Sequence, residues 1–216
     1  MNLLAFDSAQ AACSSAILHD GTIVARRIAH MQRGHAEALM PMIVGVLGDA
    51  GIGFAALDRV AVTIGPGSYT GIRVGLAAAK GIALARGIPL IGVTTLEAVA
   101  RAARPQRPAG PILVVLETKR ADLYVQPFDA ALRPTAAPRV VAPDAVEVPD
   151  GALIAGDGAV RLQPRLALRH DVTFAAGDGI VDAAVVAAIA AERSSSGPVL
   201  PLYLRPPDVT LPRSAA

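Results

Sequence analysis

Two short segments of the chain carry side chains that could bind a nucleotide. Asp7 and Ser8 end an apolar run, and a carboxylate followed by a hydroxyl group could handle the metal and the phosphates of ATP. Gly156, Asp157 and Gly158 follow a later apolar run and could form a second phosphate loop. Both segments are also ordinary turn sequences, because short polar side chains hydrogen-bond to nearby backbone and glycine permits sharp turns. We favour the turn interpretation for each segment.

The most distinctive stretch of the sequence is glycine-rich and covers residues 65–75. A glycine-rich turn that leads into a helix presents free amide groups and the positive end of the helix dipole, which together can hold an anion. A Walker A loop needs Lys after its last glycine, and here Gly71 is followed by Ile72. We therefore interpret the stretch as a strand-to-helix turn in which Ser68 or Thr70 caps the helix.

The helix predicted after this turn has small residues at every fourth position, namely Gly71, Gly75 and Ala79. Residues four apart lie on the same side of a helix, and small side chains there would let another helix approach closely. We expect this side to be exposed and to contact a partner protein. Tyr69 and Arg73 are the expected contact residues at the start of the helix, because Tyr and Arg are enriched in interfaces.

The histidines and the cysteine do not predict metal or nucleophilic chemistry. A helical zinc site needs a second His four residues after the first, and the residue four after His35 is Leu39. We expect His35 to begin a helix and Glu37 to be favoured there by the helix dipole. Cys13 lies in an apolar run without a neighbouring His, which predicts a buried structural thiol. The other histidines, His19, His30 and His170, are scattered, and no Ser, His and Asp set has a supporting motif.

The hydrophobic pattern predicts alternating strands and helices. Three β-prone runs open the chain at residues 2–7, 12–19 and 22–30, and Asp20 and Gly21 predict a tight turn between the last two. A helical period follows from residue 36, and Pro41 inside it means that the helix either kinks there or begins late. The further predicted elements are strands at 59–64, 88–93, 112–117, 121–128 and 152–155 and helices at 72–86, 96–103 and 181–193. This alternation predicts a mixed or parallel sheet covered by helices.

The Arg- and Pro-rich segment 101–110 is the clearest boundary in the chain. It predicts an N-terminal lobe at residues 1–103 with the helices that dock a partner, and a smaller C-terminal lobe at residues 111–205. Residues 206–216 are predicted to be a disordered tail. We find no internal sequence repeat of the length that solenoid proteins use.

Composition and charge exclude several classes of protein. The chain has 216 residues and is 53% hydrophobic, which is enough for a sizeable core, but it has no apolar run that could span a bilayer and no export signal. A single cysteine cannot form a disulfide within the chain, so an oxidising compartment would not stabilise it, and we expect a cytoplasmic protein. A net charge of +2 and 3% aromatic residues disfavour a free-standing RNA-binding module.

Taken together, the sequence resembles the TsaB family, also called YeaZ. The resemblance is carried by residues 4–8 and 12–14, residues 33–37 with Leu39 and Pro41, residues 65–76 and 79–81, and the closing segment 201–205. It is dense over the N-terminal lobe and sparse afterwards. It implies an α/β fold of the actin-like ATPase (ribonuclease H-like) type, with two lobes, mixed sheets and a reduced second lobe.

The resemblance also implies a function. TsaB proteins take part in forming threonylcarbamoyladenosine in tRNAs that read codons beginning with A. They form a heterodimer with the catalytic paralogue TsaD, which uses a metal, and the ATPase TsaE joins the pair. The missing second histidine at Leu39 and the short chain favour a non-catalytic partner over a catalyst.

Several expectations follow from this family role. The chain would need no cofactor of its own, although ATP could lie at the partner interface, and it would meet tRNA only through the complex. It could form a homodimer when alone, and no contact with a membrane is expected. We expect the helices at 35–47 and 72–86 to dock on equivalent helices of TsaD, through His35, Leu39, Tyr69, Gly71, Arg73, Gly75 and Ala79. A large side chain at Gly75 should then abolish pairing and leave the fold intact.

The sequence departs from the family in one segment. Where the family usually has Asp-Ala-Arg-Arg before its tyrosine, this chain has residues 117–120, Glu-Thr-Lys-Arg, before Tyr124. The charge is kept and the shape is changed, so we assign no anion or tRNA role to the segment.

Three other functions compete with the family role. The first is an actin-like ATPase or kinase that holds ATP through Asp7, Ser8 and the turn at residues 156–158. The second is a metallopeptidase, and the third is the free-standing RNA-binding module.

Overall fold

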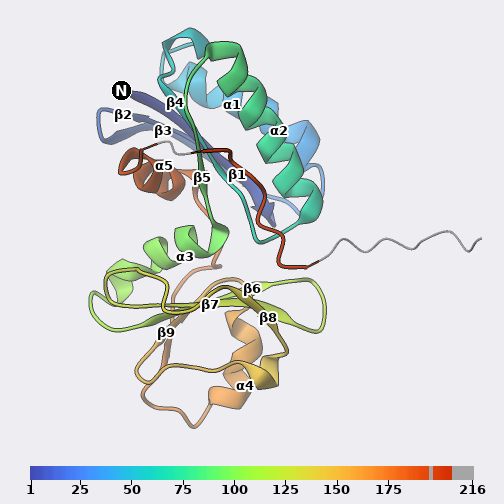
Figure 1. Ribbon diagram of the computed structural model, residues 1–216, viewed down its shortest axis with the longest axis vertical. Helices are drawn as coiled ribbons and strands as arrows, with labels where there is room; N and C mark the ends of the chain where they lie inside the picture. The colour runs from blue at the N-terminus through green and yellow to red at the C-terminus, as the bar shows by residue number, and fades with distance from the viewer. Residues whose placement is uncertain (195–196, 206–216) are drawn as a thin grey trace, which may run out of the picture.

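Two five-stranded sheets form the two lobes of the molecule (Figure 1). The computed structural model describes residues 1–194 and 197–205. Sheet A, in lobe I, has the order β3-β2-β1-β4-β5 and consists of β1 (Asn2–Gln10), β2 (Ala12–His19), β3 (Thr22–His30), β4 (Arg59–Thr63) and β5 (Leu90–Val93). Strands β1, β4 and β5 are parallel to one another, and β2 runs antiparallel to β1 and β3. The predicted mixed sheet is confirmed.

The turn between β2 and β3 has the backbone that the sequence predicts. Asp20 has φ 45° and Gly21 has φ 83°, and two consecutive residues with positive φ are typical of a tight hairpin turn. Asp and Gly adopt this conformation at lower cost than other residues. The turn brings the Asp20 carboxylate to the N-terminal amino group of Met1, with which it forms an ion pair.

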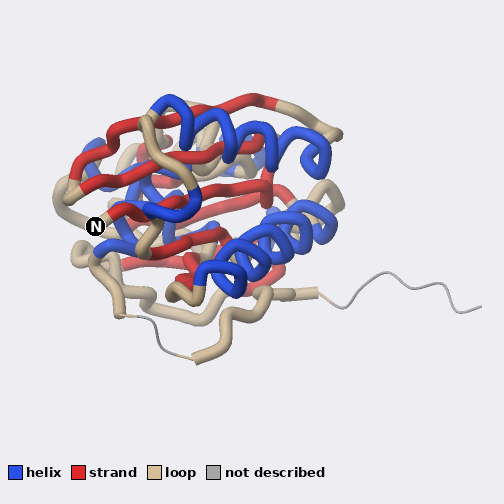
Figure 2. Tube along the Cα trace, turned by 90° about the horizontal axis from the view of Figure 1, so that it is seen from above, coloured by secondary structure: helices blue, strands red, loops and turns tan. Residues whose placement is uncertain are grey.

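Helices α1 (His35–Asp49) and α2 (Tyr69–Arg86) contact each other and pack on sheet A (Figure 1), and Figure 2 shows the helices and strands of the molecule from above. Helix α1 begins at His35 and includes Pro41, so it does not begin late. Helix α2 begins three residues earlier than predicted because Ser68 caps it, accepting a hydrogen bond from the Gly71 amide at 3.3 Å. It ends at Arg86, and the following Gly87 has φ 64°, a left-handed conformation that terminates the helix.

Sheet B, in lobe II, repeats the topology of sheet A with shorter elements. Its order is β10-β9-β6-β7-β8, and its strands are β6 (Ile112–Glu117), β7 (Leu123–Phe128), β8 (Arg139–Val141), β9 (Leu153–Ala155) and β10 (Thr173–Phe174). Counted from the start of each lobe, both sheets have the order 3-2-1-4-5 with the same strand directions. Short helices η3 (Pro143–Ala145), η4 (Ala159–Leu162) and α4 (Gln163–Leu166) stand where lobe I has α1 and α2. The reduced second lobe is therefore confirmed.

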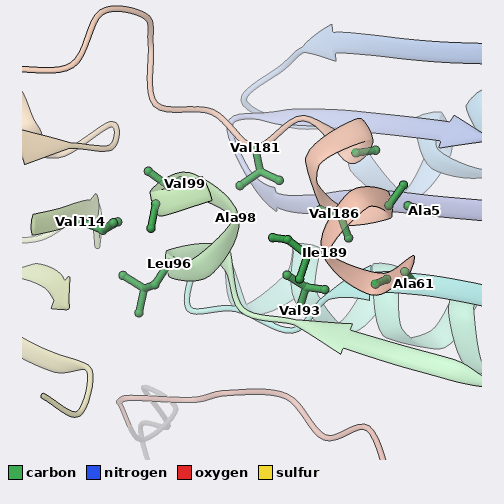
Figure 3. Packing of buried hydrophobic residues seen from close by; sticks show 14 of the residues in the cluster. Ala5, Ala61, Val93, Leu96, Ala98, Val99, Val114, Val181, Val186 and Ile189 are labelled. Carbon is green, nitrogen blue, oxygen red and sulfur yellow. The ribbon is translucent and has the colours of Figure 1, made fainter. Parts of the chain in front are cut away.

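Two helices lie between the sheets and connect the lobes. Helix α3 (Thr95–Ala103) follows lobe I in the chain but packs on β6 of sheet B, whereas α5 (Ala183–Ala191) follows lobe II but packs on β1 and β2 of sheet A. Their side chains meet in one central hydrophobic core (Figure 3). The two lobes are thus not separated at the predicted boundary between residues 103 and 111, because each lobe packs against a helix that lies on the other side of this boundary in the sequence.

Two further segments complete the described chain. Short helices η1 (Phe54–Ala56) and η2 (Arg104–Gln106) lie before β4 and after α3. Residues 197–205, which we call the C-terminal strap, return to lobe I, where the Leu202 amide donates to the Ile64 carbonyl at 2.8 Å. The predicted tail at 206–216 lies outside the described residues. Within the described residues, no helix is both long and apolar enough to cross a membrane.

Candidate functional site

Asp7 lies inside lobe I at the end of β1 and does not reach the surface. The Thr63 hydroxyl and the Ala9 amide (3.1 Å) donate to one carboxylate oxygen, and the other oxygen has no partner among the described residues. Burial raises the pKa of Asp7 to about 6, although the hydrogen bond from Thr63 opposes the rise. A carboxylate enclosed in this way cannot reach a ligand in the space between the lobes.

Ser8 is also used inside the lobe. Its hydroxyl group donates to the Gly71 carbonyl at 2.9 Å, so it joins β1 to the first turn of α2. Ser8 is buried, as Asp7 is. The structure therefore gives both residues the structural role that the turn interpretation favoured.

Asp157 is the one residue of the two predicted phosphate segments whose side chain faces the space between the lobes. Its carboxylate accepts a hydrogen bond from the Glu117 amide at 2.9 Å, and burial raises its pKa to about 6. Gly156, with φ 114°, lies against β6, where an added Cβ would be 2.2 Å from the Val115 carbonyl oxygen. The glycines of this turn thus serve close packing, and the structure does not bring Asp157 together with Asp7 and Ser8 in one site.

Gln10 joins the two lobes, a role that its sequence neighbourhood did not predict. Its side-chain oxygen accepts from the Val181 amide at 2.8 Å, and its side-chain nitrogen donates to the Gly179 carbonyl at 3.2 Å. It also hydrogen-bonds to Asp157. All three partners lie far away in the chain, so no local sequence pattern could have indicated this role.

The small residues of α2 that were expected to face a partner face sheet A instead. An added Cβ at Gly71 would lie 1.9 Å from the Ser8 carbonyl oxygen, and one at Gly75 would lie 2.8 Å from the Ser8 hydroxyl oxygen. Ala79 is completely buried, and so is Leu39 of α1. The expected exposure of these four residues is wrong, because the helices need their small and apolar sides to approach the sheet. A large side chain at Gly75 would therefore disturb the fold itself.

His35, Tyr69 and Arg73 have partners within the chain. The His35 ring donates from Nε2 to the Gln10 carbonyl at 2.8 Å. The Arg73 guanidinium lies 3.9 Å from the centre of the Tyr69 ring and donates to the Tyr203 hydroxyl at 3.1 Å. The Tyr69 and Tyr203 ring centres are 5.0 Å apart, so this cluster holds the C-terminal strap against the start of α2.

The exposed sides of α1 and α2 carry apolar residues among charged ones such as Lys80. Met40 and Val44 of α1 are exposed, Val44 by 55%, and Leu84 of α2 is 85% exposed. Ala77 and Gly81 lie on the exposed side of α2 as well, and nothing lies within 4 Å of a Cβ added at Gly81. We call these five residues the helical face. It is the surface of the two helices that remains available to a partner.

A cleft of about 580 Å³ lies between the two lobes and the strap. It lies beyond the carboxyl ends of β1 and β6, which is where open α/β sheets bind ligands. Its lining comes from lobe I (residues 9–11, 66–69 and Ile72), from lobe II (residues 116–120, Tyr124 and Asp157) and from the strap (residues 202–205).

The described part of the chain has neither a group of side chains arranged to bind a metal ion nor a reactive thiol. No group of three His, Cys, Asp or Glu side chains within residues 1–194 and 197–205 is arranged to hold a metal ion. Cys13 is buried, as predicted, and burial raises its pKa to about 11. Such a thiol stays protonated and unreactive at neutral pH.

The chain is similar to known proteins over most of its length. The chain matches the family model described as "TsaD: tRNA N6-adenosine threonylcarbamoyltransferase" over residues 22–194. An uncharacterized protein of Mycobacterium tuberculosis is 34% identical over 208 residues, which are 95% of this chain and 92% of that protein. The tRNA threonylcarbamoyladenosine biosynthesis protein TsaB of Escherichia coli is 35% identical over 127 residues, which are 57% of this chain and 53% of that protein.

A solved structure is similar over nearly its whole length. It is an uncharacterized protein from Pseudomonas aeruginosa with similarity to the peptidase YeaZ. The TM-score is 0.78 at 25% identity, and the match covers 94% of this chain and 99% of that one. This likeness confirms the two-lobed, actin-like fold that the resemblance implied.

Proposed function

Because the chain belongs to the TsaB (YeaZ) family, we propose that it is a non-catalytic subunit of the complex that forms threonylcarbamoyladenosine in tRNAs reading codons that begin with A. In this proposal a TsaD-like protein supplies the transfer chemistry, a TsaE-like ATPase joins the pair, and tRNA is bound through the complex. The chain acts in the cytoplasm, where tRNA is modified. It has no cofactor of its own, and ATP is bound at the interface with the partner if at all.

The observation that carries this proposal is the helical face. Val44 of α1 and Leu84 of α2 are exposed together with small residues on two helices that contact each other, and exposed apolar surface of this kind marks a protein interaction site. Ala77 and Gly81 would let the helices of a partner approach closely. A TsaD-like protein has the same fold family and so can offer an equivalent helix pair, which favours it as the partner. When the chain is alone, a second copy of it could bind to the same helical face and form a homodimer.

The non-catalytic role is supported by how the chemistry-bearing residues are used. Asp7, Ser8 and His35 each form a hydrogen bond with backbone or side chains of the same lobe. The ATPase alternative needs Asp7 and Ser8 in the cleft, and both are enclosed. This arrangement favours a partner over a catalyst.

The proposal is tested by substituting Leu84 with Asp and measuring pairing with the TsaD-like protein of the same organism. A buried charge at the centre of an apolar contact should weaken pairing by at least about tenfold. Light scattering after size-exclusion chromatography would then show separate species where the unsubstituted chain forms a mixed complex.

Leu168→Asp is the matched control for this test. Leu168 is 88% exposed, close to the 85% of Leu84, but it lies in lobe II, away from the helical face. The control should pair as the unsubstituted chain does. Equal pairing by both variants would show that the helical face is not the docking surface, and the absence of any mixed complex would overturn the proposed function itself.

A further inference from the structure

All three tyrosines of this protein line the interlobe cleft. They are Tyr69 of lobe I, Tyr124 of lobe II and Tyr203 of the strap, and the chain has no tryptophan. Tyr69 and Tyr203 lie close together and are each 38% exposed. Aromatic rings gathered in a cleft form a surface on which an unpaired base can stack.

The lobe II rim of the same cleft carries positive charge. Lys119 and Arg120 lie there, in the loop between β6 and β7, and both are exposed. The Arg161 guanidinium holds this loop by donating to the backbone carbonyls of Arg120 (2.9 Å) and Asp122 (3.1 Å). Lys119 has φ 60°, and its ammonium group has no partner among the described residues. The loop, whose backbone is held by Arg161, thus presents a cation that no residue of the described chain pairs with.

The carboxylates around the cleft already have partners. Glu117 is paired with Arg161 at 3.2 Å, and Asp122 is paired with Arg205 of the strap. Asp157 accepts the hydrogen bond from the Glu117 amide. The charge at the exposed rim, where Lys119 and Arg120 lie, is therefore positive and suits a phosphate group, whereas the partly buried Asp157 has neutral partners.

We propose that the cleft binds an unpaired nucleotide of RNA, with its base against Tyr69 and Tyr203 and its phosphate at Lys119. The inference rests on the proposed function, which brings tRNA to the complex, and it names the surface of this chain that meets the RNA. It also gives an anion role to residues 117–120, to which the sequence alone assigned none. A nucleoside triphosphate with its metal suits the cleft less well, because Asp7 is enclosed and Glu117 is paired.

The tyrosines themselves provide the test. When the chain is labelled with 3-fluorotyrosine, fluorine NMR gives one signal for each of the three residues, and every signal reports on the cleft. We expect a single-stranded RNA oligonucleotide to shift the signals of Tyr69 and Tyr203, in the chain alone and in its complex with the TsaD-like partner. AMP at the same concentration should shift them much less, because it lacks the neighbouring phosphates.

Lys119→Asn removes the proposed phosphate contact and suits the backbone, since Asn tolerates positive φ. We expect this variant to weaken RNA binding by about tenfold and to lower the slope of log affinity against log salt concentration by about 1. Lys80→Asn is the matched control, because Lys80 is the other lysine of the chain and lies on α2 outside the cleft. Its RNA affinity should be unchanged.

Three results would overturn the inference. The tyrosine signals could stay in place when RNA is added to the chain and to the complex. The two lysine variants could bind RNA equally well. AMP could shift the signals as strongly as RNA, which would make the cleft a mononucleotide site. If the chain forms no complex with the TsaD-like protein, the proposed function fails, and the titration of the chain alone still decides whether the cleft binds RNA.

Discussion

The buried carboxylate of Asp7 is the most unusual polar group in lobe I. It accepts hydrogen bonds from Thr63 and Ala9 on one oxygen, while the other oxygen has no partner among the described residues. Because burial disfavours the charged form, the pKa of Asp7 rises to about 6 from an ordinary value of 3.8. The folded protein therefore binds a proton here at a pH at which the unfolded chain has already released it.

This difference makes the stability of the protein depend on pH. A group whose pKa is higher in the folded than in the unfolded state stabilises the fold at pH values below its unfolded-state pKa. This stabilisation is lost as the pH rises through its folded-state pKa. The free energy of unfolding should thus fall between about pH 4 and pH 6 through Asp7, and Asp157, with a pKa also near 6, adds to the trend.

Asp7→Asn should reduce this pH dependence. The amide keeps the oxygen that accepts from Thr63 and Ala9 and removes the titrating charge. Its NH2 group takes the place of the oxygen without a partner, and an unpaired buried donor costs about 1–3 kcal/mol, which offsets the gain at pH 7. Thermal unfolding measured from pH 4.5 to pH 7.5 would show a shallower slope than that of the unsubstituted chain. An unchanged slope would mean that Asp7 titrates normally in the folded state.

At the scale of single elements, α2 has small residues on two of its sides. Gly71, Gly75 and Ala79 form one row, and Ala77 and Gly81 lie on the opposite, exposed side. The first row packs on β1, because it allows the helix backbone to approach Ser8 closely. The second row belongs to the helical face.

The same substitution in the two rows should have opposite effects on stability. Gly71→Ala places a Cβ 1.9 Å from the Ser8 carbonyl oxygen, so we expect a loss of about 1–3 kcal/mol from overpacking. Gly81→Ala meets no atom within 4 Å and removes a flexible residue from a helix, so we expect a gain of about 0.5–1 kcal/mol. Denaturation in urea, followed by circular dichroism, measures both. Equal effects of the two substitutions would contradict the assignment of the buried row.

At the scale of the whole molecule, the lobes are joined by exchanged helices. Helix α5 from the C-terminal half supplies Val186 and Ala187, which are completely buried between the sheets, and Gln10 and Ser14 of lobe I bind the segment that leads to α5. The strap then returns along lobe I to Tyr69, and Arg205 at its end is paired with Asp122 of lobe II (Figure 1). Neither lobe has a complete core without the other half of the chain.

A fragment of residues 1–110 should therefore not fold alone. Without α5, the face of sheet A that carries Ala5 and Ala16 would be exposed to water. We expect the fragment to unfold without a cooperative transition, and to regain one when the fragment of residues 111–205 is added. Circular dichroism during heating tests this expectation. A cooperative transition of the first fragment alone would show that lobe I is an independent domain.

Local patterns in the sequence were sufficient to predict most of the elements of lobe I. The turn at Asp20 and Gly21, the cap at Ser68 and the strand and helix periods all depend on residues that are near one another in the chain. In lobe II the short strands β8 and β10 were missed because neither is a buried apolar run, whereas the equally short β9 was predicted and all three of its residues are buried. The family motif in residues 65–76 is equally local, and it led to the correct family and fold.

The residues that come together between the lobes could not be predicted in this way. The three tyrosines, Lys119 and Gln10 meet through the topology of the sheets, and nothing near each of them in the sequence indicates the others. The choice of the buried row on α2 has a similar origin, because two rows of small residues fit a sheet equally well until the position of Ser8 is known. Periodicity shows that a helix has an apolar or small side, whereas the partner of that side depends on how the whole chain is folded.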